Sequence, residues 1–256
     1  MLGVPAPTDF DLNFRLLGIP VRVNPFFWVL AAFLGWSGRS GGEVLVWIAC
    51  VFVSILVHEL GHGLAARSLL RQQPAIILHM MGGLCTFERN NRAPWRQLAI
   101  LLLGPGAGFL LFLLVAVLGT AILGIAPFGM ALVHQPPRWF LTSPANQLIQ
   151  EAYFDLLVIN LFWTIFNLLP IYPLDGGQAT HTLFSMRNAR EGPKWCFIVS
   201  IGIAAVLAVY FYQRDMTFNA LLIGYFGLIN FQNLQATQFQ SRYGDGFEQD
   251  DNWWRK

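Results

Sequence analysis

The feature that most constrains this chain is a long apolar run, from about residue 44 to residue 70, that contains three neighbouring ionisable side chains. A run of this length can cross the hydrocarbon core of a bilayer as a helix. Three of its ionisable residues, His58, Glu59 and His62, form the pattern H-E-x-x-H. Titratable groups are costly inside a membrane and usually mark a functional site there. The run is therefore predicted to be a spanning helix that carries chemistry.

The rest of the composition also indicates a polytopic membrane protein. Apolar residues make up 55% of the chain and charged residues only 12%, against about 25% charged in ordinary soluble domains. The net charge of +2 is too small to suggest a nucleic-acid partner, and the sequence has no basic cluster with interleaved aromatics, so none is expected. Cys50, Cys85 and Cys196 are far apart, which argues against both a disulfide scaffold and a cysteine-zinc site.

Hydropathy predicts an all-α membrane protein with about six transmembrane helices. The strand-like runs Pro74 to Met80 and Leu84 to Phe87 add a small β-hairpin or sheet. Residues 1–25 are predicted to be a cytoplasmic tail without a cleavable signal peptide, in which Phe14 to Val23 can form a strand. Residues 26–232 form one membrane domain, and residues 233–256 a second cytoplasmic tail. The expected spans are 26–36, 44–70, 97–124, 152–169, 195–212 and 218–232.

Cationic residues predict the orientation. All of the 16 Lys and Arg residues except Arg39, Arg138 and Arg214 fall in the tails, loops and adjoining span end that six spans place on one side, with Arg67 at the end of the span 44–70. The positive-inside rule then puts both termini in the cytoplasm and the protein in the cell (inner) membrane. His58 lies 14 residues after Val44, or about 21 Å down the helix. This depth is inside the membrane, nearer its cytoplasmic face.

The pattern H-E-x-x-H indicates a zinc site. In a helix, His58 and His62 leave from the same face one turn apart, so both imidazoles can bind one Zn²⁺. Glu59 flanks such a metal and can act as general base. The competing interpretation is a pair of buried histidines that hydrogen-bond to neighbouring helices. It has to satisfy three polar groups in a medium of low dielectric constant.

A catalytic zinc ion needs a third protein ligand, and Asp175 is the candidate. It ends the stretch N-L-L-P-I-Y-P-L-D from Asn167 to Asp175, at the same predicted membrane level as the histidines. Pro170 and Pro173 interrupt the helix, and irregular backbone at this depth has to be enclosed by protein or a water-filled cavity. The alternative is a surface carboxylate in a turn just past the helix.

At these residues the chain resembles the site-2 protease family of intramembrane zinc metalloproteases. V-H-E-L-G-H and N-L-L-P-I-Y-P-L-D-G-G match the two motifs of that family, in the same order. The resemblance implies one Zn²⁺ per chain, held by His58, His62 and Asp175, with Glu59 as the catalytic base. It further implies a role in substrate binding for Asn167, for which the alternative is a hydrogen bond between helices. Asn160 is expected to make a packing contact between helices instead.

The resemblance also predicts a membrane-associated β-hairpin within Gln72 to Glu88. Its glycines, Gly82 and Gly83, are candidate substrate-binding residues, because an exposed strand edge can pair with a substrate in extended form. There are two departures from the family pattern. Gly108 stands where members often carry Asn, and the stretch from Ile125 to Glu151 is too short for a PDZ domain. The chain therefore resembles a minimal member of the family.

The predicted function is zinc-dependent cleavage of peptide bonds within or near the transmembrane segments of other membrane proteins. Its partners are then the lipid bilayer and a transmembrane protein or peptide substrate. Whether the chain forms a homo-oligomer or has a regulatory partner stays open. Two alternatives are a membrane metal transporter or sensor, and an inactive relative that binds membrane clients. A third, another protease class with a glutamate ligand, would have to use Glu151 or Asp155, which lie at the wrong depth.

Overall fold

The computed structural model describes residues 6–36, 38–87, 93–123 and 144–247. These residues belong to two compact units, Met1–Phe166 and Asn167–Lys256, which are described one at a time. The stretch 124–143, part of the segment too short for a PDZ domain, lies outside the described residues, as do both chain ends.

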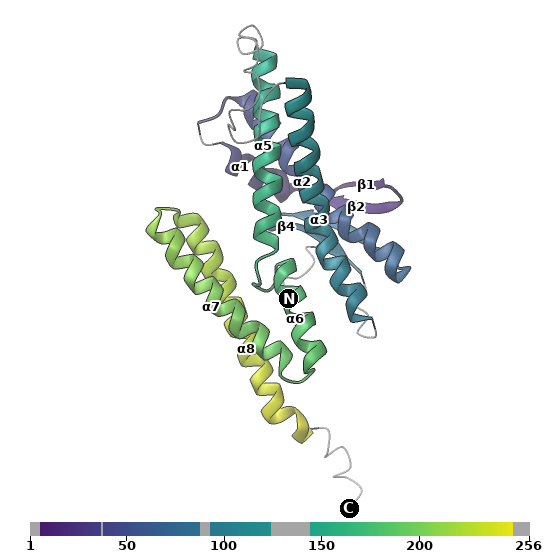
Figure 1. Ribbon diagram of the computed structural model, residues 1–256, viewed down its shortest axis with the longest axis vertical. Coiled ribbons are helices and arrows are strands. Elements are labelled where there is room, and N and C mark those ends of the chain that lie inside the picture. The colour runs from purple at the N-terminus through teal and green to yellow at the C-terminus, as the bar shows by residue number, and fades with distance from the viewer. Residues whose placement is uncertain (1–5, 37, 88–92, 124–143, 248–256) are drawn as a thin grey trace, which may run out of the picture. The chain divides into compact units, whose positions relative to one another are not determined.

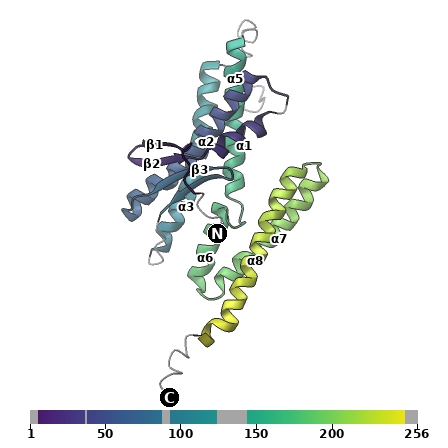
Figure 2. The same ribbon diagram turned by 180° about the vertical axis from the view of Figure 1, so that it is seen from behind.

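Three long helices form the frame of the first unit (Figures 1 and 2). They are α2 (Gly41–Leu70), α3 (Pro94–Leu118) and α5 (Pro144–Asn167). The last residue of α5, Asn167, is assigned to the second unit. A π-helical turn, η1 (Gly119–Leu123), continues α3. The short helix α1 (Pro25–Gly35) packs against α2.

A four-stranded sheet lies beside these helices, in the order β1-β2-β3-β4. The strands are β1 (Leu12–Leu16), β2 (Ile19–Val23), β3 (Ala75–His79) and β4 (Gly82–Thr86). Strands β2 and β3 pair in parallel, and the two outer pairs are antiparallel. The single strand expected from Phe14 to Val23 is thus a hairpin, with a turn at Leu17 and Gly18, where φ is positive.

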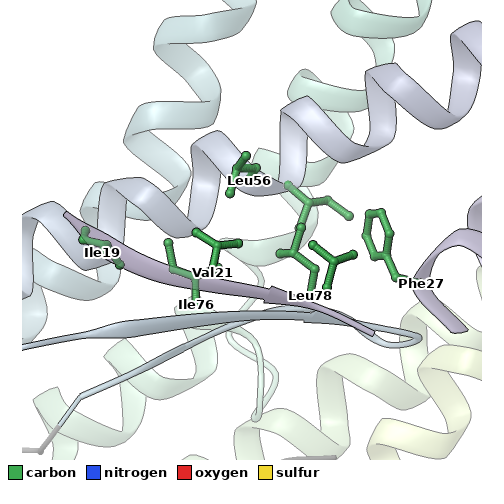
Figure 3. Close-up of a cluster of buried hydrophobic side chains, with 8 residues drawn as sticks. Ile19, Val21, Phe27, Leu56, Ile76 and Leu78 are labelled. Atoms are coloured by element: carbon green, nitrogen blue, oxygen red, sulfur yellow. The ribbon is translucent and has the colours of Figure 1, made fainter. Parts of the chain in front are cut away.

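Alternating apolar residues of the sheet bury themselves against the helices. Ile19, Val21 and Val23 of β2 and Ile76 and Leu78 of β3 point to one face, as the two-residue period of a strand requires. Figure 3 shows this cluster below α2, closed by Leu56 of α2 and Phe27 of α1. The sheet is therefore fixed to the helix that carries H-E-x-x-H.

The second unit consists of α6 (Asp175–Arg187), α7 (Gly192–Gln213) and α8 (Thr217–Phe247). Helices α7 and α8 lie side by side in both views (Figures 1 and 2). All six expected spans are helices. Four of them, α2, α3, α5 and α7, are long and apolar enough to cross a membrane among the described residues. Helix α1 is only 11 residues long, which is short for a membrane span. The predicted count of six spanning helices is therefore approximate.

One ion pair joins distant parts of the first unit. Arg39 donates two hydrogen bonds, of 2.9 and 2.7 Å, to the carboxylate of Asp155 on α5. The guanidinium also lies over the ring of Trp47, 4.7 Å from its centroid. Asp155 is buried. Asp155, one of the two carboxylates that the alternative protease class would use as a metal ligand, is therefore engaged in a structural ion pair with Arg39.

We expect the variant Arg39→Met to lower the free energy of unfolding by about 2 kcal/mol or more, because it leaves Asp155 buried without its cation. The double variant Arg39→Met, Asp155→Leu should recover most of this loss. Denaturant unfolding in detergent measures both. Equal stability of the single variant and the wild type would show that the ion pair contributes nothing.

Candidate metal centre

Helix α2 presents the three ionisable residues of the H-E-x-x-H motif to the protein interior. A capping box starts the helix: the Ser40 amide donates to the Glu43 carboxylate at 2.7 Å, and the Glu43 amide to the Ser40 hydroxyl at 3.4 Å. His58, Glu59 and His62 are only 2%, 4% and 5% exposed. The motif thus occupies a buried part of a helix long enough to span a bilayer.

The two histidines face each other through their Nε2 atoms. These nitrogens are 3.2 Å apart, and the two rings stand nearly perpendicular, at 79°. Two nitrogen ligands of one tetrahedral zinc ion, each about 2.0–2.1 Å from the metal, are about 3.3 Å apart. The spacing of the imidazoles therefore fits one shared zinc ion.

The other nitrogen of His62 is oriented by the neighbouring helix. His62 Nδ1 lies 2.8 Å from the carbonyl oxygen of Ile100 on α3. A carbonyl can only accept, so Nδ1 must carry the proton, and the lone pair is then on Nε2. Metal-ligating histidines are commonly oriented in this way. The contact leaves the nitrogen that faces His58 available for a metal.

Glycines of α3 make room for the histidine rings. A Cβ atom at Gly104 would overlap the ring of His62, and one at Gly61 would overlap the backbone of α3 at Leu103. At Gly108 a Cβ would lie 3.0 Å from Thr164 Oγ1 and 3.9 Å from His58 Nδ1. Gly108, the departure from the family pattern, is thus adjacent to the candidate ligand.

Glu59 lies against the outermost strand of the sheet. A Cβ atom at Gly83 in β4 would overlap the Glu59 side chain. Gly82 has a φ of +117°, and its Cβ would lie 3.0 Å from the Trp163 ring. Both glycines are the first residues of β4. The structure therefore brings Gly83 to the side chain of the candidate base and Gly82 to Trp163.

Asp175 is the first residue of α6 in the second unit, and it is buried. A carboxylate is favoured at a helix N-terminus, because the dipole places positive potential there. The preceding loop folds back on this turn: Cβ atoms at Gly176 and Gly177 would overlap the backbone at Leu168 and Ile171. Asn167, at the end of α5, is also buried.

One polar contact was predicted from the sequence, and two others were not. Asn160 donates a hydrogen bond of 2.9 Å to Ser54 on α2, which is the expected packing contact between helices. Ser200 on α7 and Asn230 on α8 both bond to the loop before Asp175. Nothing in their sequence surroundings links them to that loop, because only tertiary packing brings them there.

A membrane helix bundle with a buried H-E-x-x-H pair and a glutamate beside an edge strand is the arrangement of a membrane-embedded metallopeptidase. The model of peptidase family M50 matches residues 46–211. The chain belongs to this family, the site-2 proteases.

Individual relatives agree with this assignment. The chain is 28% identical to a putative zinc metalloprotease of Synechocystis sp., over 84% of this chain and 57% of that protein. It is 27% identical to stage IV sporulation protein FB of Bacillus subtilis, over 65% and 48%. The chain thus spans about half the length of these curated relatives. The solved structure of a site-2 protease from Methanocaldococcus jannaschii has the same fold, with a TM-score of 0.58 at 19% identity over 88% of this chain and 95% of that one.

The variants Gly104→Ala and Gly106→Ala test the close approach of α3 to the histidines. A methyl group at residue 104 would displace the His62 ring, so we expect the protein to lose most of its bound zinc. At Gly106 nothing lies within 4 Å of an added Cβ. That variant should keep its zinc and gain up to about 1 kcal/mol of stability from helix propensity.

Zinc content of the purified proteins, measured beside their unfolding curves, provides the comparison. Equal zinc in both variants would contradict the placement of His62 against α3.

Proposed function

We propose that the chain is a zinc-dependent intramembrane endopeptidase that hydrolyses peptide bonds within or near the transmembrane segments of other membrane proteins. The observation that carries the proposal is the facing pair of His58 and His62 nitrogens, 3.2 Å apart inside a membrane helix, with Glu59 next in sequence. A peptidase family match over most of the chain supports the same reaction class.

The proposed ligands of the zinc ion are His58, His62 and Asp175. Each is buried and offers one ligand atom. Three protein ligands leave a fourth position open, as catalytic zinc sites do. The carboxylate of Asp175 would offset part of the ion's charge, which a low-dielectric surrounding requires.

A bound zinc ion supplies a Lewis acid that polarises the scissile carbonyl and lowers the pKa of water. Glu59 would take the proton from the attacking water and then pass it to the departing amine, as a general base that becomes a general acid. Its burial beside Gly83 holds the carboxylate in place. Asn167 would hydrogen-bond to the substrate near the reacting carbonyl.

The substrate would bind as a strand along β4, at the edge of the sheet. In a helix the peptide bonds are shielded by their own hydrogen bonds, so a transmembrane segment has to unwind before it is cut. An edge strand offers unpaired N–H and C=O groups to an extended chain. Strand β4 is an edge of the sheet, and its Gly83 lies against Glu59. A segment paired there would lie next to the base.

The distribution of Lys and Arg supports a cell-membrane location with both termini in the cytoplasm. With the site nearer this side, cleavage would release a fragment to the cytoplasm. The membrane domain, residues 26–232, would then carry all of the proposed chemistry. A metal transporter would require further polar residues along a path, and it would give Glu59 no role.

The variant Glu59→Gln separates the enzyme from its alternatives. We expect it to keep its zinc and to lose cleavage of a model transmembrane substrate by at least about 10²-fold, because the general base is gone. Zinc transport or client retention should survive the substitution. Cleavage by the variant at the wild-type rate would sink the assignment of Glu59 as the base.

Photo-crosslinking tests the edge-strand mode of substrate binding. A benzophenone amino acid at Leu84 in β4 should crosslink to a transmembrane substrate in the Glu59→Gln protein. The matched control is the same probe at Asn13 in β1, the opposite edge of the sheet. Equal crosslinking from the two edges, or none from Leu84, would refute pairing along β4.

A further inference from the structure

The loop between α5 and α6 is held by side chains from α7 and α8. The Tyr172 amide donates a hydrogen bond of 3.1 Å to the Ser200 hydroxyl, which itself donates to the Pro170 carbonyl at 3.2 Å. Asn230 Nδ2 donates to the Tyr172 carbonyl. One residue of the loop thus has both its N–H and its C=O fixed from outside the loop. With both groups held, the path of the chain towards Asp175 is set.

The loop needs such contacts because it lies in an apolar protein and has little regular structure. Backbone polar groups that water cannot reach require partners within the protein. Gln178 on α6 adds another contact, from its amide to the Pro173 carbonyl at 2.9 Å. The Cys196 thiol donates to the Gly177 carbonyl at 3.4 Å.

The hydrogen bond from Asn230 to the Tyr172 carbonyl has an energetic cost. The Asn230 side chain is fully buried, and Nδ2 also donates to the Phe226 carbonyl at 2.7 Å. Its Oδ1 accepts no hydrogen bond from any described residue. A buried acceptor in this state costs about 1–3 kcal/mol. Asn230 thus gives the Tyr172 carbonyl a partner at the expense of its own oxygen, and the contact fixes that peptide group.

We propose that Ser200 and Asn230 are positioning residues for the metal site. They fix the peptide groups of Tyr172, and so set the place and direction in which the Asp175 carboxylate leaves α6. This inference rests on the proposed function, in which Asp175 is the third ligand. The two residues touch neither metal nor substrate, and they act only through the loop.

Helices α7 and α8 would then affect the metal affinity of the site through Asp175, a ligand that lies on α6. Residues that orient metal ligands typically change metal affinity by about 10–100-fold when they are substituted. The substitution Asn230→Leu keeps the approximate volume and removes the donor. The matched control is Asn219→Leu, on the same helix. Among the described residues, the Asn219 side chain makes no hydrogen bond to the loop.

Cobalt binding to the metal-free protein provides a test that does not depend on activity. We expect Asn230→Leu to weaken Co²⁺ affinity by about 10–100-fold and to shift the visible d–d bands as Asp175→Ala does. Ser200→Ala should do the same to a smaller extent. Asn219→Leu should bind like the wild type.

A double-mutant cycle distinguishes positioning from general destabilisation. If Asn230 acts through Asp175, the variant Asn230→Leu should have no further effect on Co²⁺ affinity in an Asp175→Ala background. Additive losses, or unchanged affinity in both Asn230→Leu and Ser200→Ala, would overturn the proposal. Failure of the wild type to bind Co²⁺ would instead overturn the proposed function. If Asn230→Leu does not fold, the same cycle is run with Ser200→Ala.

Discussion

Inside a bilayer, water is not available to satisfy polar groups, and the rest of this structure depends on that constraint. Each buried polar side chain and each irregular stretch of backbone needs a partner from the protein. His62 finds a carbonyl on α3, Asn160 finds Ser54, and Asp155 finds Arg39. The proposed ligands and base are thus part of a wider set of polar contacts, within otherwise apolar helices.

Close approach of the backbones makes these contacts possible. Gly61 and Gly104 allow α2 and α3 to pack so tightly that the His62 ring replaces a side chain of α3. Gly83 similarly lets β4 reach Glu59. Small residues at helix contacts are the usual means of tight packing in membranes, where no hydrophobic force drives helices together. In this chain the same small residues also shape the candidate site.

The sequence predicted the parts of the structure that repeat or that carry unusual chemistry. Apolar runs located the helices, because the thickness of a bilayer sets their length. The motif around His58 was conspicuous because ionisable groups are rare in such runs. The contact of Gly83 with Glu59, the helix α6 and the loop contacts of Asn230 were not predicted. Each results from packing between segments far apart in sequence, for which a single chain contains no periodic signal.

The expected strand from Phe14 to Val23 illustrates the same limit. Its β-branched residues indicated extended structure, but the turn at Leu17 and Gly18 divides it into a hairpin. The parallel pairing of β2 with β3 joins residues more than 50 positions apart, such as Val21 and Ile76. Local pattern therefore gave the type of structure, and tertiary packing on α2 gave the sheet.

The central claim is that two histidines of α2 and one aspartate of α6 hold a single catalytic zinc ion. The most direct measurement is the zinc content of detergent-purified wild type and Asp175→Ala, with cleavage of a transmembrane substrate followed in parallel. The account predicts about one zinc per wild-type chain, and the loss or weakening of both zinc and cleavage in the variant. Full zinc and full cleavage in Asp175→Ala would contradict it.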